Sequence, residues 1–170
     1  MVKVIRILPA SVTDMPLVRG LAEKIWPAAY SSILSPEQIR YMMDLLYSNS
    51  SLERQISQDG HRFLLAFREE EPLGFASFGS LGGEGFKLHK LYVLPSSQGS
   101  GIGKMLMDQV IGEAKTSLVT FLELNVNRFN PARKFYERLG FRVLREVDIP
   151  IGGGFFMNDY IMRLPLSPGN

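Results

Sequence analysis

The hydrophobic pattern begins with a short strand and continues in a helical period. Val2–Leu8 is rich in Val and Ile, which predicts a strand that Pro9 ends. Thr13 or Asp14 can then cap a helix that stops at Pro27. Apolar residues recur along one face of this helix, namely Leu17, Val18, Leu21, Ala22 and Ile25.

A second helix is predicted to start at Ser35-Pro36-Glu37-Gln38. Here serine can cap the helix, proline suits its first turn, and glutamine completes a capping box. The apolar residues of its buried face are Ile39, Met42, Met43 and Leu46. Three strands follow, and their short connections favour an antiparallel meander: His61–Phe67, Leu73–Ser80 and Phe86–Leu94.

Helices and strands alternate in the second half of the chain. The period becomes helical from Gly101, with Ile102, Met105, Leu106, Val110 and Ala114 on one side. A further helix should begin at Asn130-Pro131 and end at Gly140, the usual order of cap, first-turn proline and terminal glycine. The remaining strands are Thr120–Val126, Phe141–Val147 and Phe155–Arg163.

The predicted order of elements is β-α-α-β-β-β-α-β-α-β-β, which defines a mixed α/β (α+β) fold. We expect a mostly antiparallel sheet of about seven strands flanked by about four helices. The third helix connects two neighbouring strands as a crossover, so this pair should be parallel. No repeat or Gly/Ser/Pro-rich linker divides the chain, and we expect residues 1–170 to form a single domain.

Composition narrows the class of protein further. The 170 residues are 45% hydrophobic and 21% charged, which is typical of a globular protein. A net charge of +2 argues against binding nucleic acid or a membrane through charge alone. No apolar run approaches the ~18 residues of a membrane span, and the charged start is unlike a signal peptide, so we expect the cytoplasm.

The residue types exclude several kinds of chemistry. Cysteine is absent, which rules out disulfides, thiolate metal sites and a cysteine nucleophile. The only histidines are His61 and His89, so a histidine-rich metal centre is not expected and we predict no metal.

A glycine-rich turn joins the strand ending at Leu94 to the following helix. Gly99, Gly101 and Gly103 stand at alternate positions, where backbone amides can converge without Cβ atoms in the way. The helix N-terminus adds partial positive charge, so the turn suits a phosphate or diphosphate. The Walker and G-x-G-x-x-G patterns both fail here. The alternative is a turn that merely bends the chain.

At these residues the sequence resembles the GNAT superfamily of N-acetyltransferases. Gln98-Gly99-Ser100-Gly101-Ile102-Gly103 matches the Q/R-x-x-G-x-G/A signature of that family, and Leu91-Tyr92-Val93-Leu94-Pro95 matches the strand leading into it. A second stretch is similar to the family's Asn-x-Ala helix and the F-Y-x-x-x-G-F motif: it runs from Asn130-Pro131-Ala132 to Phe135-Tyr136-Glu137-Arg138-Leu139-Gly140-Phe141.

The resemblance implies acetyl-CoA as the acyl donor. Residues from Gln98 to Lys104 would bind its diphosphate, the backbone of Leu91 to Val93 would pair with the pantetheine arm, and Asn130 would contact the same arm. The cofactor-binding residues so implied are Leu91, Tyr92, Val93, Gln98, Gly99, Ser100, Gly101, Ile102, Gly103, Lys104, Asn130 and Tyr136.

Acetyl transfer to an amine needs a neutral nucleophile, a site for the developing oxyanion, and a proton for the departing thiolate. Tyr136, which the resemblance places near the sulfur, can donate that proton because a phenol stays protonated at working pH. The amide of Leu91 could stabilise the oxyanion on a strand that the family shows splayed. Without the family pattern, the Phe135-Tyr136 pair in an amphipathic helix would favour a core position for Tyr136.

The general base is less evident from the sequence. Many family members carry Glu where Lys87 stands here. His89 lies two residues further along, on the same face of the strand, and is suited to proton transfer near neutrality. The alternatives are a packed His89, a base acting through water, or Glu123 of the adjacent strand. Asn125 and Asn127 are expected beside the cofactor arm.

The acceptor site is predicted between the first two helices and the last strands. Trp26, Tyr30 and Tyr41 could contact an ammonium group, or could pack the helices together. The segment from Trp26 to Tyr30, which links the first two helices, and the stretch 155–162 resemble the PaiA-like spermidine/spermine acetyltransferase branch. That branch has glutamates where Lys87 and His89 stand here, which weakens the expected attraction for a polycation.

The leading hypothesis is therefore an acetyl-CoA-dependent N-acetyltransferase that acts on a small primary amine, perhaps a polyamine, by direct attack in a ternary complex. The alternatives are acetylation of a protein or peptide amine, and a non-catalytic acyl-CoA sensor. The protein should be a monomer or a homodimer.

Overall fold

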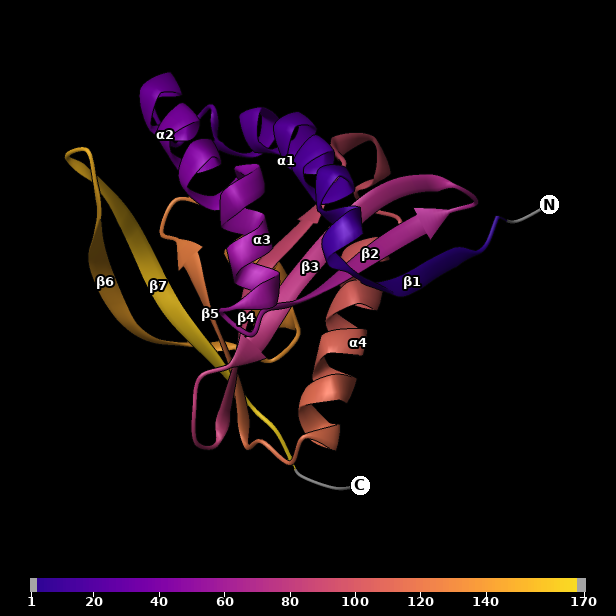
Figure 1. The fold of residues 1–170 in the computed structure, drawn as a ribbon. Coiled ribbons are helices and arrows are strands. Elements are labelled where there is room, and N and C mark those ends of the chain that lie inside the picture. The colour runs from indigo at the N-terminus through magenta and orange to yellow at the C-terminus, as the bar shows by residue number, and fades with distance from the viewer. Residues whose placement is uncertain (1–2, 168–170) are drawn as a thin grey trace.

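The computed structural model describes residues 3–167, which form a seven-stranded sheet with helices on both faces (Figure 1). The strands are β1 (Ile5–Ala10), β2 (Arg62–Arg68), β3 (Glu71–Ser80), β4 (Gly85–Val93), β5 (Phe121–Asn127), β6 (Arg142–Gly152) and β7 (Phe155–Pro165). The helices are α1 (Met15–Tyr30), α2 (Pro36–Tyr47), α3 (Asn49–Ser57), α4 (Ile102–Thr116) and α5 (Ala132–Arg138). Among the described residues none of these helices is long and apolar enough to cross a membrane.

The sheet has the strand order β1-β2-β3-β4-β5-β7-β6. Within residues 3–167, β4 and β5 are the one parallel pair, because α4 carries the chain across the sheet between them. The predicted mixed, mostly antiparallel sheet is confirmed. The pairing of β4 with β5 ends at Leu88 and Leu124, although β4 continues to Val93 and β5 to Asn127. The two strands therefore diverge in the middle of the sheet.

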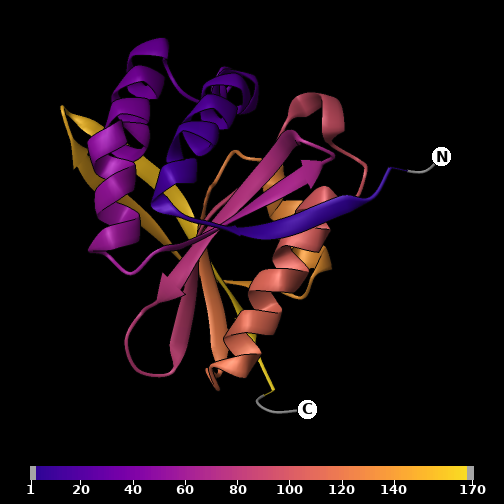
Figure 2. The same ribbon diagram turned by 45° about the vertical axis from the view of Figure 1, so that its right-hand side comes forward.

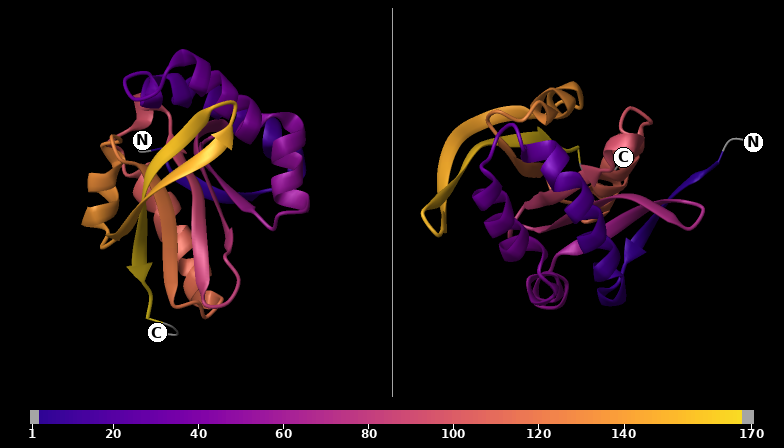
Figure 3. Two further views of the ribbon diagram at one scale, coloured as in Figure 1. Left: turned by 90° about the vertical axis from the view of Figure 1, so that its left-hand side faces the viewer. Right: turned by 90° about the horizontal axis from the view of Figure 1, so that it is seen from above.

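Each face of the sheet packs against its own helices (Figures 2 and 3). Helix α4 buries Leu106, Met107 and Val110 on one face, in a core that also includes Tyr136 of α5. Helices α1 to α3 cover the other face, where Trp26 and Tyr47 pack over Phe75. The gap between β4 and β5 therefore lies between two helical layers, one on each face of the sheet.

Helix α3 is absent from the predicted order. Its sequence, Asn49–Ser57, buries Ser51 and Gln55 beside Leu52, so its inward face is half polar. A periodicity of apolar residues does not detect such a helix. A capping residue was nevertheless present in the sequence. It is Ser48, whose hydroxyl accepts a hydrogen bond from the amide of Ser51 at 3.2 Å.

Two prolines do not end their elements as predicted. Helix α1 continues through Pro27 to Tyr30, and the amide of Ser31 still donates to the Pro27 carbonyl at 3.1 Å. Proline removes one donor, while the extra turn buries Tyr30 against Trp26, with ring centroids 4.5 Å apart. Strand β1 includes Pro9 because β1 is an edge strand, where one row of amides has no partner.

Two smaller predictions concern the N-terminal segment. Leu17 was expected on the buried face of α1 but is 40% exposed, and Met15 is buried instead. The buried face of the helix is therefore rotated away from Leu17 and toward Met15, relative to the predicted face. The predicted start of the first strand at Val2 lies outside the described residues.

The β6–β7 hairpin extends beyond the sheet and curves toward α2 (Figure 1). Two hydrogen bonds fix it there: Tyr41 donates its hydroxyl to the Ile151 carbonyl at 2.6 Å, and the Gln38 side-chain amide donates to the Phe156 carbonyl at 2.8 Å. The hairpin and α2 together therefore cover one end of the gap between β4 and β5.

Candidate active site

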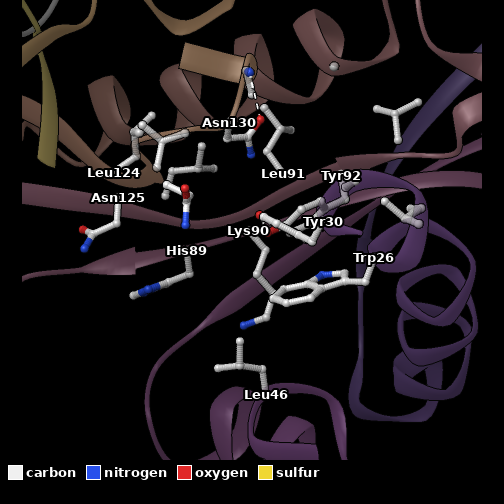
Figure 4. A pocket seen from close by; sticks show the side chains of 18 of the residues that line it. Trp26, Tyr30, Leu46, His89, Lys90, Leu91, Tyr92, Leu124, Asn125 and Asn130 are labelled. Atoms are coloured by element: carbon white, nitrogen blue, oxygen red, sulfur yellow. Dashed lines mark hydrogen bonds between the residues drawn. The ribbon is translucent and has the colours of Figure 1, made fainter. Parts of the chain in front are cut away.

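A cavity of about 1150 Å³ fills the gap between the diverging strands. It runs from the glycine turn before α4 to the inner side of α1, α2 and α3, and its middle is lined by His89, Lys90 and Leu91 of β4 and by Asn125 of β5 (Figure 4). The divergence of β4 and β5 is the cause of this cavity, because a continuously paired sheet would close it.

The glycine turn has the geometry that the sequence predicts. Gly99 and Gly101 adopt φ of +81° and +84°, values that other residues rarely adopt. The first bond of α4 runs from the amide of Met105 to the Gly101 carbonyl at 3.0 Å. The amides of Ile102, Gly103 and Lys104 precede this bond, so they are free of the helix ladder. The turn therefore presents several donors at a positive helix end.

Eleven of the twelve predicted cofactor residues line the cavity: Leu91, Tyr92, Val93, Gln98, Gly99, Gly101, Ile102, Gly103, Lys104, Asn130 and Tyr136. The twelfth, Ser100, is not among the lining residues, and its hydroxyl donates to the Ser97 carbonyl. Lys104 forms an exposed ion pair with Asp108 at 2.8 Å. The side chain of Asn130 accepts a hydrogen bond from the amide of Ala132 at 2.9 Å. Helix α5 begins at Ala132, so Pro131 rather than Asn130 is its N-cap, and the predicted first-turn proline lies just before the helix.

Tyr136 lies in the cavity wall, on α5. The residue is 8% exposed, and burial raises the pKa of its phenol above the ordinary value. Its hydroxyl makes no hydrogen bond with any side chain or backbone group in residues 3–167. Tyr136 is therefore a fully protonated phenol with a free donor in the cavity.

A β-bulge in β4 directs two consecutive side chains toward α3. Register shifts between β3 and β4 where Ser77 pairs with Lys90 and Phe78 with Leu88, so that His89 is the extra residue. His89 stacks on His61, with ring centroids 3.8 Å apart, while Lys90 donates to Gln55 of α3 at 2.6 Å. The bulge explains why both side chains reach the same end of the cavity.

The electrostatic surroundings make His89 a weak base. Burial, followed by the electrostatic influence of His61, Lys90 and Lys87, lowers its pKa from 6.5 to about 3. His61 is affected in the same direction, chiefly by burial, and its pKa falls to about 4. Both imidazoles are consequently neutral at neutral pH.

Sequence reasoning missed two charged residues of this site. Lys90 is 6% exposed, and burial lowers its pKa from 10.5 to about 8. Asp159 of β7 is 4% exposed, receives a hydrogen bond from Asn125 at 3.4 Å, and has its pKa raised chiefly by burial. Asp159 is the single acidic residue in the largely apolar stretch 155–162, and this contrast was the available sequence signal. Lys90 had no comparable signal.

The remaining candidates are divided between cavity and core. Trp26 and Tyr30 line the cavity, Trp26 donates to the Tyr47 hydroxyl at 3.2 Å, and the hydroxyls of Tyr30 and Tyr92 lie 2.8 Å apart. Tyr41 is not among the lining residues, since its hydroxyl is bound to the hairpin. Glu123 is also not among them, and forms an ion pair with Arg163 at 2.9 Å. Neither residue faces the cavity that the other candidates share.

The cavity, the free amides of the glycine turn and the diverging strands together form one candidate active site. The family model described as Acetyltransferase (GNAT) domain matches residues 30–151. The chain belongs to this family, and it is an N-acetyltransferase.

Individual relatives match either most of the chain or one part of it. The crystal structure of the PaiA N-acetyltransferase from Thermoplasma acidophilum in complex with coenzyme A is 26% identical, covers 96% of this chain and 99% of its own, and superposes with a TM-score of 0.81. An uncharacterised N-acetyltransferase of Mycobacterium tuberculosis is 26% identical over 88% of this chain and 96% of its own. The ribosomal protein bS18-alanine N-acetyltransferase of Haemophilus influenzae is 42% identical over 62 residues, which are 36% of this chain and 40% of that protein.

Proposed function

We propose that the protein transfers the acetyl group of acetyl-CoA to a primary amine of a small molecule, by direct attack while both substrates are bound. The observation that carries this proposal is the single cavity that joins the glycine turn to the space under α1, α2 and α3, with the Tyr136 hydroxyl in its wall. A donor and an acceptor can meet in such a cavity without leaving it.

The described residues fit the coenzyme. Gly99 and Gly101 turn the backbone through positive φ just before α4, where amides free of the helix ladder could donate to a diphosphate. The edge of β4 beyond Leu88 has no strand partner on the β5 side, so its backbone groups can pair with an amide-bearing arm. The coenzyme would supply a thioester that is activated toward amines.

Tyr136 would act as the general acid. Burial raises the pKa of its phenol, so the residue carries its proton at neutral pH and can donate a hydrogen bond, and then the proton, to the departing thiolate. The amide of Leu91, on the unpaired edge of β4, would donate to the oxygen on which negative charge develops. Both groups are positioned by secondary structure, so they need little rearrangement to act.

The acceptor amine must lose a proton before it attacks, and its surroundings favour that loss. Lys87 and Lys90 line the acceptor end of the cavity, and their positive charges disfavour the protonated form of the acceptor amine. Since the pKa of His89 is about 3, we assign it the role of hydrogen-bond acceptor for the neutral amine, with water taking the proton. This role replaces that of general base, for which an imidazole of such low basicity is poorly matched.

A small acceptor is favoured over a protein by the position of the β6–β7 hairpin. Its hydrogen bonds to Tyr41 and Gln38 hold it against α2, which leaves less room for a polypeptide beside the acceptor end. Acetylation of a protein amine is the second candidate, and the local similarity to the bS18-alanine N-acetyltransferase is what favours it.

Thiol release from acetyl-CoA tests the proposal. The panel comprises small primary amines, spermidine, a lysine peptide and a peptide with N-terminal alanine, each with a reaction lacking the amine. We expect release that depends on a small amine. Release with peptides alone would favour the second candidate, and coenzyme binding without amine-dependent release would leave a non-catalytic acyl-CoA sensor.

A further inference from the structure

Lys90 is a buried cation with no anion beside it. The residue is 6% exposed, and in the described part of the chain Nζ makes no ion pair with a carboxylate. Its one hydrogen bond goes to Gln55 Oε1 at 2.6 Å, and the rings of Tyr47 and Phe63 lie 5.6 Å from Nζ. An ammonium has three donors, so two remain unused. Burial of an unpaired charge is costly, which calls for an explanation at this position.

Gln55 holds Lys90 in place rather than neutralising it. The Gln55 amide nitrogen donates to the Leu46 carbonyl at 2.9 Å and to the Ser51 hydroxyl at 3.0 Å. These two bonds fix the amide, so that Oε1 faces Lys90. Figure 4 shows the Lys90 side chain leaving β4 toward Leu46, beside Trp26 and on the same side as His89. The ammonium is thus fixed at the acceptor end of the cavity.

The other charged groups around this end do not supply the missing anion. Lys87 also lines the cavity and makes no ion pair within residues 3–167. Asp59 is paired with Arg54 at 3.5 Å. Asp159 receives its hydrogen bond from Asn125 on β5, across the gap from β4. The two histidines are neutral at neutral pH. Positive charge therefore exceeds negative charge along β4.

We propose that Lys90, supported by Lys87, binds an anionic group carried by the acceptor itself, so that the substrate is a primary amine bearing a carboxylate. This inference rests on the proposed function and specifies its substrate class. A carboxylate of one negative charge matches a single fixed ammonium, and the hydrogen bond between two charged groups is among the stronger ones in proteins.

The same arrangement disfavours polyamines. A polycation entering the cavity would meet Lys87 and Lys90 and lose its hydration without gaining an opposite charge. A carboxylate-bearing amine gains that opposite charge while its own ammonium group remains free to approach His89. The charges on β4 therefore discriminate between acceptors by repulsion as well as attraction.

Matched acceptor pairs test the inference with the unmodified protein. We compare kcat/KM, from thiol release, for phenylalanine against phenethylamine and for β-alanine against propylamine, with spermidine as the polycation. The carboxylate-bearing member of at least one pair should be preferred by roughly tenfold to a hundredfold, the range for one hydrogen bond to a charged group. Preference for the neutral members or for spermidine would overturn the inference and leave the proposed function intact.

The variant Lys90→Met then assigns the preference to this residue. It should lower kcat/KM for the preferred carboxylate-bearing amine by about tenfold more than kcat/KM for the neutral counterpart, which loses only the positive charge that disfavours its ammonium form. Lys24→Met, which removes an exposed charge from α1, should change neither. Equal losses with both acceptors would assign Lys90 to the chemistry or the fold and would overturn the inference.

A binding measurement gives a readout that does not depend on turnover. With coenzyme A present, N-acetylphenylalanine should raise the melting temperature of the wild type and of Lys24→Met, and should raise that of Lys90→Met much less. If Lys90→Met does not fold, Lys87→Met and the wild-type acceptor pairs still decide the question. If no amine of any kind is acetylated, the proposed function itself fails, and this inference fails with it.

Discussion

The charge on Lys90 makes a prediction about stability that is independent of any substrate. Replacing Lys90 with Met keeps the length of the side chain and removes the buried charge. The pKa of Lys90 falls from 10.5 to about 8 on folding, so the unfolded chain binds the proton more tightly than the native state does. Wild-type stability should therefore rise with pH between these two values, whereas Lys90→Met lacks this contribution.

The magnitude follows from the two pKa values. With 10.5 unfolded and about 8 folded, the protonation of Lys90 costs the native state about 3 kcal/mol at pH 7 and about 1 kcal/mol at pH 9.5. The wild type should consequently gain about 2 kcal/mol relative to Lys90→Met over this interval. Other groups titrate in the same range, but their contributions cancel in the difference between the two proteins.

Urea unfolding at both pH values measures this difference. Lys24→Met serves as the matched control, because it loses the same charge from an exposed site. Its free energy of unfolding should change with pH in parallel with that of the wild type. Parallel curves for the wild type and Lys90→Met would refute the reasoning, since they would mean that Lys90 keeps an ordinary pKa in the folded protein.

Three further predictions concern the cavity. Tyr136→Phe should lower kcat by about 10²- to 10⁴-fold with coenzyme affinity nearly unchanged, measured by thiol release and calorimetry, and unchanged turnover would remove its role as acid. Gly101→Val forces a β-branched residue into φ of +84° and should abolish coenzyme binding in calorimetry, whereas Gly103→Ala, whose new Cβ would come no closer than 3.7 Å to Phe135, should bind normally. His89→Gln should raise KM and keep the acidic limb of the pH–rate profile between about pH 5.5 and 8, because the pKa of His89 is about 3; loss of that limb would restore His89 as the base.

The sequence predicted those parts of the fold that local patterns control. Alternation and turn glycines located all seven strands, and Asn130, Pro131 and Gly140 located α5, since each acts within a few residues of its own position. Helix α3 was missed because its buried face carries Ser51 and Gln55. Helix α1 passed Pro27 because burial of Tyr30 outweighs one lost hydrogen bond.

The candidate site could likewise be predicted only where local sequence patterns control it. The glycine turn is a local feature, and its signature alone predicted the end of the cavity that we assign to the coenzyme. The acceptor end depends on contacts between distant residues: the bond from Lys90 to Gln55 spans 35 positions, and the stacking of His61 on His89 requires a bulge that no residue pattern announces. A lysine in an apolar strand gives no sign of which partner it meets.

Calorimetric titration with coenzyme A and with pantetheine tests the central claim most directly, since pantetheine shares the arm but lacks the diphosphate. The account predicts clear binding of coenzyme A and much weaker binding of pantetheine, because the amides between Gly99 and Lys104 would have no anion to hold. No heat with coenzyme A, or equal affinities for the two compounds, would contradict it.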